Sequence, residues 1–87
     1  MDVSDLYENS NAIIAYVISK QHKMTTNNFK GQVIQYIRRY CEKYFHKIFS
    51  TNILLDFYEL FEDRFQRLYD EIKAINERIK MGDYEAS

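Results

Sequence analysis

An all-α fold is predicted by three observations on the sequence. Its 87 residues include no Pro and only two Gly, so the strongest helix breakers are scarce. Apolar residues recur at helical spacing, and those from Phe57 to Ile79 follow steps of 4, 4, 3, 4, 3 and 4 residues. Polar clusters that suit helix N-caps separate the periodic stretches. We therefore expect one small bundle of three helices, at about residues 10–21, 28–49 and 52–81.

The first helix, over about residues 10–21, has one apolar stripe. Its members follow the i, i+1, i+4, i+5 pattern: Ile13, Ile14, Val17 and Ile18. The preceding run Asn9–Asn11 is poor helix interior, because its side chains compete for backbone hydrogen bonds. We therefore expect a break there and a short separate arm from Val3 to Tyr7.

The second helix is predicted over residues 28–49, with its N-cap among Thr25–Asn28. Its apolar stripe consists of Phe29, Val33, Ile37, Cys41, Tyr44 and Ile48. Three cations share another stripe at i, i+4 and i+8: Arg39, Lys43 and Lys47. Arg38 flanks this stripe. The helix is therefore amphipathic, with a basic outer face.

The third helix, over residues 52–81, would be roughly 45 Å long at 1.5 Å per residue. From Phe61 onward its apolar residues follow a heptad-like repeat. Gly82 suits the left-handed position that follows a helix C-terminus. We therefore expect the domain to cover residues 1–81, with a short, disordered acidic tail at 82–87.

The predicted helices have unequal lengths, and this bears on how the third is covered. An antiparallel second helix would cover the third only to about Ala74. Either the first helix completes an intramolecular bundle, or the remaining apolar residues contact a second copy or another protein. We favour association, through an apolar seam formed by Phe65, Leu68, Ile72, Ile75 and Ile79. Tyr58 and Tyr69 are the predicted rim of this interface.

Charge is unevenly distributed along the chain. Residues 21–50 carry six Lys or Arg and one acid, whereas residues 51–87 carry five bases and nine acids. The basic helix either pairs with the acidic third helix or contacts nucleic acid. In the second interpretation four side chains would contact phosphates: Arg38, Arg39, Lys43 and Lys47. Tyr36 and Tyr40, which lie nearby, would stack on bases.

Neither catalysis nor a metal site is indicated by the residue spacing. Glu42 and His46, at i and i+4, supply at most two ligands, whereas zinc sites use three or four. The single cysteine, Cys41, forms no intramolecular disulfide. Because Met1–Ser10 lacks a signal-peptide pattern and no apolar run approaches the ~20 residues of a membrane span, we expect a cytoplasmic protein without cofactor, metal or membrane contact.

The sequence therefore favours a small, non-enzymatic protein–protein interaction module. It would act as a homodimer, or as a modulator or inhibitor bound to a larger protein. Frequent Asn, Ile, Lys, Phe and Tyr suggest an AT-rich genome such as that of a phage or mobile element. The alternative is a nucleic-acid-binding regulator that uses the basic face of the second helix.

Overall fold

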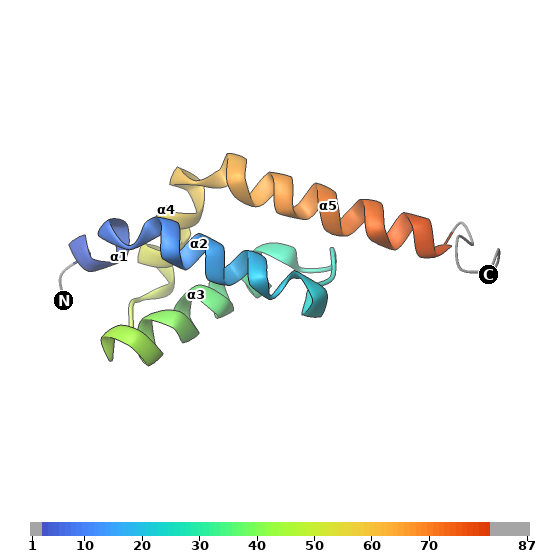
Figure 1. Cartoon of the computed structure of the whole chain (residues 1–87). Helices are drawn as coiled ribbons and strands as arrows, with labels where there is room; N and C mark the ends of the chain where they lie inside the picture. Colours follow the sequence, from blue (N-terminus) through green and yellow to red (C-terminus); the bar gives the residue numbers. More distant parts are fainter. Residues whose placement is uncertain (1–2, 81–87) are drawn as a thin grey trace.

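The structure, a computed structural model, describes residues 3–80, which form helices joined by short connections (Figure 1). In chain order these are α1 (Ser4–Glu8), α2 (Ser10–Ser19), the 3₁₀ helix η1 (Gln21–Lys23), α3 (Phe29–Phe45), α4 (Thr51–Leu60) and α5 (Glu62–Lys80). The all-α prediction is confirmed. The prediction of three helices is wrong, because five α-helices form within the described residues. The predicted tail at 82–87 lies outside those residues.

The break predicted at Asn9 is present, and the residues before it form α1. Asn9 has φ −103° and ψ 18°, and its side-chain amide donates to the carbonyl of Asp5 at 2.7 Å. Leu6 is fully buried, and the Tyr7 ring lies 5.6 Å from the Phe57 ring. The expected short arm is therefore a helical turn that packs on the core.

The second predicted helix ends earlier than expected, at Phe45 instead of residue 49. His46 adopts the left-handed conformation with φ 56°, and the N–H of Lys47 donates to the carbonyl of Cys41 at 3.3 Å. The N–H of His46 donates to the carbonyl of Glu42 at 3.1 Å, which is the 5→1 bond of an αL cap and closes the helix. The turn that follows buries Phe49 and leaves Ile48 exposed. Ser50 then caps α4 by accepting from the N–H of Ile53 at 3.4 Å.

The single long helix predicted over residues 52–81 is divided at Phe61, between α4 and α5. Phe61 has φ −109° and ψ 25°. The bend lets aromatic residues from both segments enter one core, because Phe57 of α4 and Phe65 of α5 are fully buried. Tyr58 stacks on Phe65 with ring centroids 4.9 Å apart and planes 9° apart. The buried aromatic residues therefore enter the core from two helices and do not form one continuous apolar face along a single helix.

The helices enclose one core, with α2 packed chiefly on α3 and α3 also packed on α4. In Figure 1, α4 links the lower layer to α5, which runs along the top of the view and extends past the other helices at its C-terminal end. The principal-axis extents of 52 × 22 × 19 Å reflect this projection. None of the helices in residues 3–80 has the length and hydrophobicity needed to cross a bilayer.

Candidate functional site

The predicted seam residues occupy two different environments along α5. Phe65, Leu68 and Ile72 are buried in the core of the chain itself. Ile75, one turn further along, is 44% exposed. The Ile79 side chain lies outside the described residues. The surface that remains open to a partner therefore begins at Ile75.

The two tyrosines predicted at the rim, Tyr58 of α4 and Tyr69 of α5, both contact the start of α3. Tyr58 is buried against Phe65, and Lys30 Nζ lies 5.1 Å from the centroid of its ring. Tyr69 is half-buried and meets the Phe29 ring edge-on at 5.3 Å. Burial and the nearby Glu62 carboxylate raise the pKa of the Tyr58 phenol. Both rings thus contribute to contacts within the chain.

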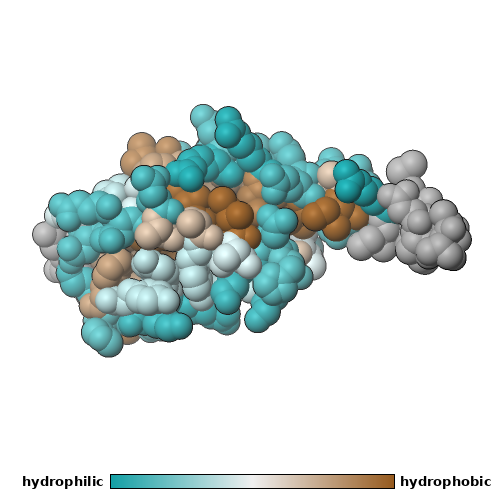
Figure 2. All heavy atoms as spheres, in the orientation of Figure 1, coloured by the Kyte–Doolittle hydropathy of each residue, from teal (hydrophilic) through white to brown (hydrophobic). Residues whose placement is uncertain are grey.

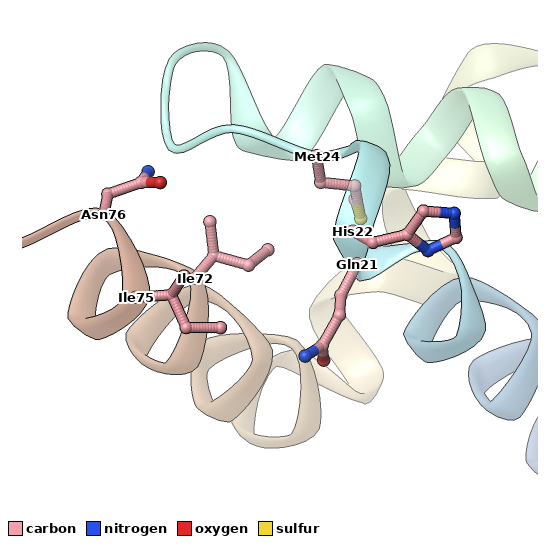
Figure 3. Close-up of a pocket in the computed structure, with 6 residues that line it drawn as sticks. All are labelled: Gln21, His22, Met24, Ile72, Ile75 and Asn76. Atoms are coloured by element: carbon pink, nitrogen blue, oxygen red, sulfur yellow. The ribbon is translucent and has the colours of Figure 1, made fainter. Parts of the chain in front are cut away.

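Two pockets lie along α5, facing the end of α2 and η1. One pocket, of about 340 Å³, lies nearer the C-terminal end of α5 and is lined by Gln21, His22, Met24, Ile72, Ile75 and Asn76 (Figure 3). A second, of about 190 Å³, is lined by Ile18, Arg64, Arg67, Leu68 and Glu71. We call the two pockets together the α5 groove and define its apolar lining as Ile18, Met24, Leu68, Ile72 and Ile75. Figure 2 shows hydrophobic residues on this face and again near the end of α5.

The side chains that line the α5 groove suit contact with apolar groups better than they suit catalysis or metal binding. Figure 3 shows Ile72 and Ile75 on α5 across the pocket from Met24, with Gln21, His22 and Asn76 at its edges. Within residues 3–80, no three His, Cys, Asp or Glu side chains converge as a metal site would require. Its lining therefore combines apolar side chains with polar groups at the edges.

The four cations predicted to meet nucleic acid are divided into two pairs. Arg38 donates to Thr51 Oγ1 at 2.9 Å and to Gln35 Oε1 at 3.3 Å, and Lys47 forms an ion pair with Asp5 of α1. Arg39 and Lys43 instead lie over aromatic rings, at 5.4 Å from Tyr36 and 5.4 Å from Tyr44. Among the described residues, the ion pair made by these cations thus runs from Lys47, just after α3, to α1 and not to the acidic helices α4 and α5.

A cluster of tyrosines beside these cations was only partly visible in the sequence. We call it the tyrosine cluster, and it comprises Tyr16 of α2 with Tyr36, Tyr40 and Tyr44 of α3. The Tyr40 ring lies 4.5 Å from Tyr44 and 5.3 Å from Tyr16. The placement of Tyr44 in the buried stripe is wrong, because Tyr44 is 53% exposed. The i, i+4, i+8 spacing on α3 signals three of the rings, but only the packing of α2 adds Tyr16.

Cys41 gives the folded state a predicted pH dependence. Burial raises the pKa of this thiol from 9.0 to about 11. The folded chain therefore holds the thiol proton more tightly than the unfolded chain. The contribution of this thiol to the free energy of unfolding is fully present below pH 9 and is lost as the pH rises towards 11. We expect a loss of about 2–3 kcal/mol over this range, measured by urea unfolding. Cys41→Ala should show a shallower decline, and an identical decline would contradict this origin.

In comparisons with known proteins, no protein-family model, curated protein or solved structure matches the chain.

Proposed function

We propose that this protein is a small, non-enzymatic interaction module that self-associates through the α5 groove. The observation that supports the proposal most directly is the exposure of two isoleucines along α5, Ile75 at 44% in the larger pocket and Ile18 at 39% in the smaller one. Burying apolar area contributes about 25 cal/mol per Å², and a groove between two helices concentrates that gain. An added helix face would cover both isoleucines together.

Charge complementarity favours a second copy of the chain as the occupant. An antiparallel pairing of two α5 helices that sets the exposed Ile75 of one copy opposite Ile75 of the other gives an isologous, two-fold contact. In this register, position 71 of one helix is level with position 79 of the other. Glu71 then lies about 1.5 Å along the axis from Arg78 of the other copy, because one residue separates their levels. Glu71 of each copy would thus pair with Arg78 of the other, and one such pair would lie on each side of the apolar contact.

The first test replaces an exposed groove residue without touching the core. Ile75→Lys is expected to shift the protein from a two-chain mass to the 10.6 kDa of one chain, because it puts a charge into the apolar contact. Sedimentation equilibrium at about 50 µM measures this shift. Leu60→Lys is the matched control, since Leu60 is 65% exposed on α4, away from the groove. Both variants should keep the wild-type helical circular dichroism.

A charge exchange tests the register itself. Glu71→Arg and Arg78→Glu should each weaken the dimer, and the double variant should restore it, because the pair is then reversed. A wild-type protein that sediments as one chain at this concentration would contradict self-association. Equal dissociation by Leu60→Lys would contradict the location of the contact.

A further inference from the structure

The tyrosine cluster carries cations at its edges, and together they form a second surface, on α2 and α3. Lys20 Nζ lies 5.2 Å from the centroid of the Tyr16 ring. Arg39 and Lys43 lie over the rings of Tyr36 and Tyr44, both at 5.4 Å. We call these three cations and the four rings the tyrosine–cation surface. Rings and positive charges thus alternate over one continuous patch of side chains.

The charge of this surface is poorly balanced by acids on the same elements. Residues 9–55 contain seven Lys or Arg and a single acid, Glu42. Within α2 itself there is no Asp or Glu. Of the four cations predicted to meet nucleic acid, Arg38 and Lys47 are engaged with Thr51 and Asp5, whereas Arg39 and Lys43 lie at the tyrosine rings. An anionic ligand would therefore meet aromatic faces as well as cations.

We propose that the tyrosine–cation surface binds single-stranded nucleic acid. Tyr36, Tyr40 and Tyr44 repeat every four residues, which spaces them about 6 Å apart along α3. Unpaired bases can stack on such rings while Lys and Arg contact the phosphates, the combination used by sequence-tolerant single-strand binders. Acidic side chains alone would satisfy the cations but would give the rings no aromatic stacking partner. Duplex bases are stacked on one another and would leave the rings unused.

This surface is independent of the α5 groove. Its residues are Tyr16 of α2, Lys20 just after it and five residues of α3, and none of them lines the α5 groove, whereas Ile75 and its charged neighbours Glu71 and Arg78 lie on α5. Loss of nucleic-acid binding would consequently leave the proposed dimer intact, and a monomeric variant would keep the tyrosine–cation surface. The mass measured for each variant therefore separates a failure of one proposal from a failure of the other.

The experiment measures fluorescence anisotropy of the full chain with labelled single strands. The probes are oligo-dT and oligo-U of about 12 nucleotides, within the range of single-strand site sizes, at about 50 mM salt, where phosphate contacts are strong. A DNA duplex and inorganic polyphosphate provide comparison ligands. We expect binding to both single strands, weaker binding to the duplex, and weaker binding to polyphosphate, which offers charge without bases.

Matched variants assign the binding to this surface. Tyr44→Ala should weaken binding at least about fivefold, and Tyr44→Phe should preserve it, because stacking needs the ring and not the hydroxyl. Lys43→Gln should reduce the slope of log affinity against log salt by about 0.7, the value for one phosphate contact with a single strand. Lys73→Gln removes another exposed cation, from α5, and should change neither affinity nor slope.

Three results would overturn the proposal. The first is no binding to either strand at low salt. The second is binding to the duplex or to polyphosphate as tight as to the single strands, with no loss in Tyr44→Ala, because charge alone would then explain it. The third is an equal effect of Lys73→Gln and Lys43→Gln, which would place the contact elsewhere.

Discussion

Phe57→Ala is expected to lower the free energy of unfolding by about 3–5 kcal/mol, the usual cost of removing a buried phenylalanine ring. Phe57 is fully buried, and its ring lies 5.6 Å from Tyr7 and 4.9 Å from Phe61. It therefore joins α1 to the end of α4. Small domains have a total stability of about 5–15 kcal/mol, so this loss is a large part of the whole.

Urea unfolding followed by circular dichroism measures the effect, and the melting temperature should fall by at least about 12 °C. Ile48→Ala is the control, because Ile48 is exposed in the turn after α3 and should cost less than about 0.5 kcal/mol. If Phe57→Ala cost no more than this control, the packing of α1 on α4 would be contradicted.

The helical nature of the chain was predictable because local signals act within a few residues. The apolar spacing of Phe29, Val33 and Ile37 places all three in the core, as the stripe predicted. The break at Asn9 was also visible, since asparagine side chains compete for backbone hydrogen bonds. These features depend on short-range chemistry, which the sequence displays directly.

The division at Phe61 was not predictable from the local sequence. No Pro or Gly occurs between Thr51 and Lys80, and the apolar spacing continues across the bend. The bend becomes favourable only when Phe57 and Phe65 are buried against other helices. The end of α3 is similar, because His46 accepts the left-handed conformation while the turn buries Phe49. Tertiary packing decides both boundaries.

The candidate surfaces also depended on packing. The sequence identified the stripe that includes Leu68, Ile72 and Ile75, but the segment at η1 and Met24 decides which of these stay exposed. Likewise, Tyr16 contacts Tyr40 because α2 packs on α3. Lys47 forms an ion pair with Asp5 of α1 and is therefore not free to bind a ligand with the other cations. Contacts between residues far apart in the chain determine which members of a predicted set remain available.

Ile72→Asp is expected to unfold the protein or to cost at least about 3 kcal/mol, because it would bury an unpaired carboxylate. Ile72 is 3% exposed and lies on α5 one turn before Ile75. The two positions belong to the same stripe, yet they should respond differently to a charge. Ile72→Asp should lose helical circular dichroism at every protein concentration, whereas Ile75→Lys should lose only the two-chain mass.

Ile72→Val supplies the control, since it shortens the side chain without adding charge and should cost about 0.5–1.5 kcal/mol. Urea unfolding at two protein concentrations, tenfold apart, distinguishes core from interface. A core position shifts the midpoint equally at both concentrations, whereas an interface position shifts it more where the dimer is more populated. If Ile72→Asp remained folded as a single chain, the burial of Ile72 within one molecule would be wrong, and the whole stripe from Leu68 to Ile75 would belong to the contact between copies.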